Sequence, residues 1–224
     1  MNFFDTLQEA TQQQRHELFN LPIIVDALQG NVGLESYRAF LAQAYYHVRH
    51  TVPLMMACGA RLPTRLEWLR KAVCAYIEDE YGHEQWVLND IAECGGDPDA
   101  VRDGQPSLPI ELMVSFLYDL IARGNPVGLF GMVNVLEGTS IALATHAAGS
   151  IRERLALPET AFSYLSSHGA LDIEHMQTYR HLMNRLEDPA DQASVIHAST
   201  VVYRLYADMF RGLPRDTEAR HAAA

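Results

Sequence analysis

Three side chains with metal-binding chemistry recur along one stretch of the chain: His168, Asp172 and His175. They stand at positions i, i+4 and i+7, so an α-helix places all three within roughly 60° of arc on one face. Two imidazoles and one carboxylate suit non-haem iron and, less specifically, zinc. The same spacing also fits an exposed polar stripe. The motif therefore predicts a metal site only if other helices bring further ligands to it.

A second pair of the same form lies earlier in the chain. Glu80-x-x-His83 repeats the carboxylate–histidine spacing of Asp172-x-x-His175. Di-iron helical bundles combine two such pairs, on two helices, with carboxylates from other helices. The sequence therefore predicts two helices that face each other across a metal centre.

The further carboxylate is Glu137, which stands alone in the apolar stretch 133–144. Burying it is costly unless it is paired or bound to metal. Capping, an internal hydrogen bond and a solvated edge are the alternatives. The predicted metal ligands, which we also expect to be the catalytic residues, are Glu80, His83, Glu137, His168, Asp172 and His175. Their three carboxylates would largely neutralise two divalent cations, and both iron and manganese accept this ligand set.

Glu80 has an alternative interpretation, because acidic residues crowd around it. Glu78, Asp79 and Glu84 are its neighbours, and together they resemble an exposed acidic turn. Gly82, next to His83, would let another backbone approach closely.

Composition limits the kinds of partner that we expect. The chain has 224 residues, 48% of them hydrophobic, and a net charge of −11, which argues against nucleic acid and anionic membranes. Three cysteines without a spacing motif favour a reducing cytoplasm. The N-terminus lacks the pattern of a signal peptide, and no stretch reaches the ~18 apolar residues of a membrane span.

Helical periodicity dominates, and no strand pattern is evident. The predicted fold is an all-α bundle of about seven helices in one domain, residues 1–213, followed by a polar tail, 214–224. Pro53 should kink one helix, and the Gly- and Pro-rich segment 95–109 should be a loop. The expected helices are 4–19, 22–28, 34–57, 63–94, 110–123, 127–148, 158–187 and 189–212.

The motif His168-x-x-x-Asp172-x-x-His175, preceded by Glu137 and His83, resembles the haem-oxygenase-like di-iron oxidases and oxygenases. These proteins are related to the TenA (thiaminase-II-like), PqqC-like (pyrroloquinoline-quinone-synthase-like) and CADD-like proteins. The resemblance implies a seven-helix bundle, two bound ferrous ions (Fe2+), dioxygen as a substrate, and frequent homodimers. Its members oxidise small amines, amino acids or carboxylic acids such as fatty acids.

One ligand position departs from many members of that family. They place a glutamate seven residues before the first histidine, where this chain has Tyr76. Other members place it three residues before, which is Glu80. If Glu80 points away from the site, Tyr76 would lie on the His83 face as an alternative ligand.

Tyr45, Arg49 and Tyr76 are the predicted substrate-binding residues. Arg49 would clamp a carboxylate through two hydrogen bonds, and Tyr45 would form an aromatic wall. Core tyrosines and a surface cation are the alternative interpretation.

Three other functions compete with the di-iron enzyme. His16 stands where haem oxygenases carry their haem ligand, but the glycine-rich helix of that family is missing, and Glu137 is in its place. A cofactorless, PqqC-like oxidase would explain the fold but not the ligand set. A metal-free, non-catalytic bundle would also keep the fold.

Overall fold

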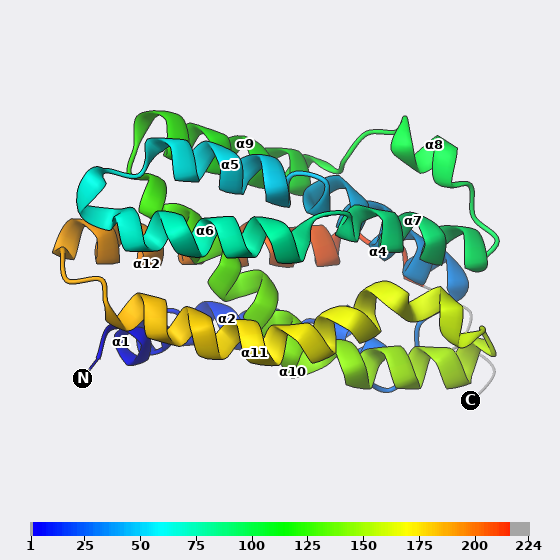
Figure 1. Cartoon of the computed structure of the whole chain (residues 1–224). Helices are drawn as coiled ribbons and strands as arrows, with labels where there is room; N and C mark the ends of the chain where they lie inside the picture. The colour runs from blue at the N-terminus through cyan, green and yellow to red at the C-terminus, as the bar shows by residue number, and fades with distance from the viewer. Residues whose placement is uncertain (1, 216–224) are drawn as a thin grey trace.

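The computed structural model describes residues 2–215, with the side chains of residues 168–174 outside that description. The described residues form a bundle of helices and contain no strand, which confirms the predicted all-α class (Figure 1). The α-helices are α1 (Phe3–Ala10), α2 (Gln12–Phe19), α3 (Pro22–Leu28), α4 (Leu34–Val48), α5 (Thr51–Arg61), α6 (Glu67–Glu80), α7 (His83–Glu93), α8 (Pro98–Arg102), α9 (Leu108–Arg123), α10 (Leu129–Leu155), α11 (Ser163–Asn184) and α12 (Pro189–Arg211). Short 3₁₀ turns η1 (Thr64–Leu66), η2 (Pro126–Gly128) and η3 (Glu159–Phe162) precede α6, α10 and α11.

Three of the expected long helices are each broken in two. The breaks lie at Thr11, at Arg49–His50 and at Tyr81–Gly82. Pro53 does not kink a continuous helix, because it lies in the first turn of α5, where proline's missing N–H is not needed. Gly82 has a φ of 90°, a left-handed conformation that ends one helix and begins the next.

The predicted loop 95–109 contains one unexpected helix, α8. Asp97 begins it, because its carboxylate accepts hydrogen bonds from the backbone N–H groups of Asp99 and Ala100. Pro98 follows at the first helical position, where its fixed φ is favourable.

Helix α10 runs through the middle of the bundle, packed against α11 and α12 (Figure 1). Its approach to α12 is close enough that a Cβ on Gly131 would lie 2.6 Å from the backbone nitrogen of Ser199. Only glycine therefore fits at this crossing. Helices α6 and α7 continue one another end to end, and α7 packs against α11 (Figure 1).

The segment Pro126–Leu155 is the one stretch of the described chain that is long and apolar enough to cross a membrane. Within the fold, 67% of its most apolar window is buried, as expected for the core helix of a bundle. Its hydrophobicity is therefore explained by packing on several sides.

Candidate metal centre

Two carboxylate side chains and one imidazole, each from a different helix, converge inside the bundle. They are Glu80 at the end of α6, Glu137 in the middle of α10, and His175 on α11. Each offers one ligand atom, and these atoms all lie within 4.8 Å of one another. Glu80 and Glu137 are each 8% exposed. The structure thus brings together three of the six predicted ligands, which are separated by up to 95 residues in the chain (175 − 80).

The donor set of this cluster suits iron. Two carboxylates buried so close together repel each other unless a proton or a cation lies between them. Carboxylate oxygens and an imidazole nitrogen are ligands that ferrous iron and manganese accept. The residues present therefore fit an iron centre.

His83 is placed beside the cluster rather than in it. Its Nδ1 lies 3.2 Å from Oε2 of Glu80, and its ring stacks on Trp86 at a centroid distance of 4.0 Å. The backbone break at Gly82 allows this contact, because Glu80 ends α6 and His83 begins α7. The prediction that another backbone approaches Gly82 closely is wrong, because a Cβ there would meet nothing within 4 Å. The glycine is needed for its left-handed backbone conformation instead.

His175 lies between two carboxylates, of which sequence analysis identified only one. Its Nδ1 is 3.8 Å from Oε1 of Glu137, and its Nε2 is 3.4 Å from Oδ2 of Asp79. In the alternative interpretation of Glu80, Asp79 belongs to an exposed acidic turn, and its side chain is indeed 56% exposed. Its position directly before Glu80 was the only signal in the sequence.

The N-terminus of α11 is anchored by Asp90 on α7, a residue that sequence analysis missed. Asp90 is fully buried, and its carboxylate accepts hydrogen bonds from the backbone N–H groups of Ser163 and Tyr164, both at 2.9 Å. Burial raises the pKa of Asp90 above its usual value, although these hydrogen bonds oppose the shift. This contact fixes the start of the helix that carries His175.

The predicted ligands His168 and Asp172 belong to α11, but their side chains lie outside the described residues. Their roles stay predictions. Tyr76 is buried beside the cluster, with its ring centroid 5.6 Å from that of His175. Glu80 joins His175 and Glu137 in the cluster, and the role of Tyr76 as an alternative ligand stays a prediction.

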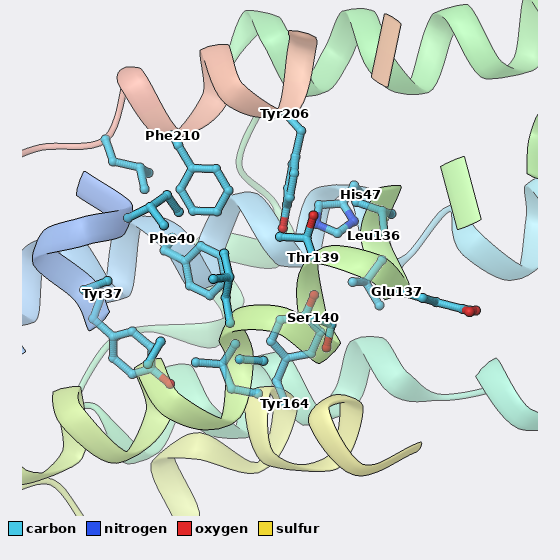
Figure 2. Close-up of a pocket in the computed structure, with 18 of the residues that line it drawn as sticks. Tyr37, Phe40, His47, Leu136, Glu137, Thr139, Ser140, Tyr164, Tyr206 and Phe210 are labelled. Carbon is cyan, nitrogen blue, oxygen red and sulfur yellow. The ribbon is translucent and has the colours of Figure 1, made fainter. Parts of the chain in front are cut away.

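A cavity of about 150 Å³ opens next to this cluster and includes Glu80 and Glu137 in its wall (Figure 2). His47 on α4 also lines it and is 5% exposed. Most of the remaining wall is aliphatic or aromatic. The cavity is therefore largely apolar, with the carboxylates of Glu80 and Glu137 in its wall at the metal centre.

The predicted substrate-binding residues are not among those that line this cavity. Arg49 instead lies over the rings of Tyr45 and Tyr46, at 5.5 Å from each centroid. On a helix, Tyr45 and Arg49 share a face, while His47 is about 200° away around the axis. The segment 45–49 does contribute to the cavity wall, but through His47 and not through Tyr45 or Arg49.

His16 lies away from the cavity as well. It is exposed on α2, where its Nδ1 is 3.2 Å from the side-chain nitrogen of Asn20. It is not one of the residues that line the chamber. The described structure therefore offers no haem ligand at His16 inside this cavity.

Several solved structures share the fold of this chain. A domain of unknown function with a heme oxygenase-like fold from Shewanella denitrificans OS217 is 21% identical, covering 100% of this chain and 97% of its own, with a TM-score of 0.83. A TenA homologue from P. horikoshii OT3 is 11% identical over 94% and 97% of the two chains, with a TM-score of 0.78. Heme oxygenase-1 from Synechocystis sp. PCC6803, solved in complex with heme, is 17% identical over 100% and 96%, with a TM-score of 0.73. The predicted haem-oxygenase-like, TenA-like fold is confirmed.

The sequence then assigns the family. Residues 38–207 match the family described as iron-containing redox enzymes, and the chain belongs to that family. Comparison with curated proteins gives no match. The range 38–207 includes all six predicted ligands, as well as His47 and Asp79.

Proposed function

We propose that this protein is a non-haem di-iron oxidase or oxygenase that activates dioxygen and acts on a small organic substrate. The observation that carries the proposal is the convergence of Glu80, Glu137 and His175 within 4.8 Å inside an iron-containing redox enzyme family. The predicted class of substrate is an amine, an amino acid or a carboxylic acid.

Six side chains would hold the two metal ions. The three converging residues supply two carboxylates and one imidazole, and His83, His168 and Asp172 complete the predicted set. Two ferrous ions bound there would supply the electrons that reduce dioxygen to a reactive oxidant. Manganese is the alternative metal, because it accepts the same donor atoms.

The chain's own groups orient the ligands and exclude water. Asp79 contacts Nε2 of His175, while Nδ1 of the same ring faces Glu137. The contact with Asp79 fixes the orientation of the imidazole ring. Asp90 fixes the first turn of α11. The apolar wall of the cavity keeps bulk water from the reacting groups, and His47 is one of the ionisable side chains in that wall that a substrate could contact.

Reconstitution with iron tests the proposal. The purified protein is loaded anaerobically with ferrous iron, its metal content is measured, and oxygen uptake is followed after exposure to air. We expect about two iron ions per chain, as a two-metal centre requires, and measurable oxygen uptake. Less than one iron per chain together with no oxygen uptake would overturn the proposal.

Two substitutions with matched controls locate the site. His175→Ala and Glu137→Gln should each lower the bound iron sharply, because each removes a ligand from the converging cluster. His181→Ala on α11 and Glu153→Gln on α10 change the same residue types at exposed positions and should leave the iron content unchanged. Oxygen-dependent activity that survives complete removal of metal by a chelator would favour the cofactorless oxidase instead.

A homodimeric state and a cytoplasmic location stay predictions.

A further inference from the structure

A second group of polar side chains lines the cavity, in addition to the carboxylates of the metal centre. It consists of His47 on α4, Thr139 on α10 and Tyr206 on α12, residues that are each 5% to 6% exposed. The rings of His47 and Tyr206 are in edge-to-face contact, with centroids 5.9 Å apart. Thr139 lies at the same end of the pocket (Figure 2). Three helices thus bring three hydrogen-bonding groups to one part of a largely apolar wall, and we call them the second polar cluster.

The hydroxyl of Thr139 has no hydrogen-bond partner in the described part of the chain. A helical threonine can donate to the carbonyl one turn earlier, as Thr200 does to the backbone oxygen of Ile196 at 3.0 Å. Thr139 does not do so, and neither does the hydroxyl of Ser140, the next residue in the same wall. A buried polar group without a partner costs free energy, and native structures keep few of them. These hydroxyls are therefore available to a molecule bound in the cavity.

The second polar cluster suits a group that carries no charge. Burial raises the pKa of Tyr206 above its usual value, so its hydroxyl keeps its proton and can donate a hydrogen bond. The hydroxyl of Thr139 can both donate and accept. Among the described residues that line the cavity, no arginine or lysine offers a fixed positive charge to an anion. An anion buried there would therefore pay a desolvation cost that an uncharged hydroxyl or carbonyl group does not.

We propose that the second polar cluster is a binding subsite for an uncharged hydroxyl or carbonyl group of the substrate. That group exchanges hydrogen bonds with Thr139 and Tyr206, and the imidazole of His47 lies beside it. The subsite positions the substrate through a group other than the one that faces the metal ions. A substrate without such a group would leave the hydroxyl of Thr139 unsatisfied. This inference rests on the proposed function for the reaction, but binding at the subsite does not require metal.

The test compares four one-ring molecules that differ only in the group on the ring: toluene, benzyl alcohol, benzaldehyde and benzoate. An apolar cavity of about 150 Å³ holds a molecule of this size. Binding to the full chain, freed of metal by a chelator, is measured by NMR titration. We expect benzyl alcohol and benzaldehyde to bind about 5-fold more tightly than toluene, as one net hydrogen bond provides. Benzoate should bind more weakly than benzyl alcohol, because its charge is buried without a fixed counter-charge.

Two substitutions that remove only a hydroxyl locate the subsite. Thr139→Val and Tyr206→Phe should each reduce the advantage of benzyl alcohol over toluene by about twofold or more, and the double variant should abolish it. Thr145→Val, an exposed change on the same helix, should keep the full advantage. Tyr37→Phe should keep it as well, because Tyr37 lines the same cavity but already donates its hydrogen bond to the backbone oxygen of Ala161 at 2.9 Å.

The outcomes separate this inference from the di-iron proposal. Equal affinity for benzyl alcohol and toluene, tighter binding of benzoate than of benzyl alcohol, or no binding of any probe overturns the subsite even if iron binds as expected. An advantage of benzyl alcohol that survives in the double variant also overturns it. A preference for benzyl alcohol in a protein that fails to bind iron supports the subsite and removes only the di-iron function. Thr139→Val remains informative if Tyr206→Phe does not fold, because the hydroxyl that it removes has no partner to lose.

Discussion

The Nε2 atom of His175 lies 3.4 Å from Oδ2 of Asp79, while Nδ1 of the same ring is 3.8 Å from Oε1 of Glu137. Nδ1 thus faces the buried carboxylate of Glu137, and Nε2 faces the carboxylate of Asp79, which reaches solvent. A metal-binding histidine usually donates its second N–H to such a partner, which fixes both the tautomer and the orientation of the ring. In the proposed metal centre, Asp79 is therefore a positioning residue for His175.

Replacing Asp79 should weaken metal binding without unfolding the protein. We expect Asp79→Ala to lower the affinity for ferrous or cobaltous ions about 10-fold, at the lower end of the range for such partners because Asp79 is half-exposed. The measurement is a metal titration followed through the visible absorption of bound cobalt. Glu78→Gln, an exposed change at the preceding residue, is the control. Equal affinities in the two variants would show that Asp79 does not orient His175.

The buried cap of α11 should matter more than an exposed cap of the same form. Asp90 and Asp97 each accept hydrogen bonds from two backbone N–H groups, but Asp90 is fully buried and Asp97 is exposed. Asp90→Ala leaves buried N–H groups unsatisfied and should lower the free energy of unfolding by about 2–3 kcal/mol. Asp97→Ala should cost about 1 kcal/mol. Urea unfolding measures both values, and equal losses would contradict the assignment of Asp90 as a buried cap.

Asp191 at the start of α12 should give the fold a defined acid sensitivity. Burial would raise its pKa, but hydrogen bonds from Arg65 at 2.6 and 3.0 Å and from Asn125 at 2.8 Å outweigh it, so the pKa lies below the usual value. A carboxylate with a lowered pKa stabilises the folded state above the ordinary aspartate pKa of about 4. That stability is lost as the pH falls through the lowered pKa.

The variant Asp191→Asn tests this pH dependence. At neutral pH it should be less stable than the parent by about 1.5–3 kcal/mol, the range for hydrogen bonds to a charged group. The difference should shrink below about pH 4, as the parent carboxylate becomes protonated. Thermal unfolding from pH 7 downward follows the difference, and a constant gap across that range would contradict the prediction.

Two glycines with open space around them should respond in opposite directions to alanine. A Cβ at Gly82 or at Gly149 would meet no atom within 4 Å, so neither substitution creates a clash. Gly82 has a φ of 90°, and Gly82→Ala should destabilise the fold by about 1–2 kcal/mol through backbone strain. Gly149 is inside α10, and Gly149→Ala should stabilise it by about 0.5–1 kcal/mol. Chemical denaturation of both variants checks the signs, and a stabilising Gly82→Ala would disprove the role of the left-handed turn.

The sequence alone determined the class of fold and the kinds of side chain in the site. Helical periodicity and local signals identified α3 at Pro22–Leu28 and the start of α12 at Pro189. Those signals act within a few residues, because caps, prolines and apolar faces are properties of a single helix. Glu137 likewise stands out in the sequence, because it is a single carboxylate in an otherwise apolar helix.

Only the tertiary structure decided which of those side chains meet. Spacing gives the face of a helix relative to its own axis, but not the neighbour that this face contacts. Packing placed Glu80 with Glu137 and His175, left His83 beside them, and turned His47 rather than Arg49 toward the cavity. Asp79 could not be recognised from sequence, because its partner His175 is 96 residues away (175 − 79) and meets it only when α6 and α11 are packed together.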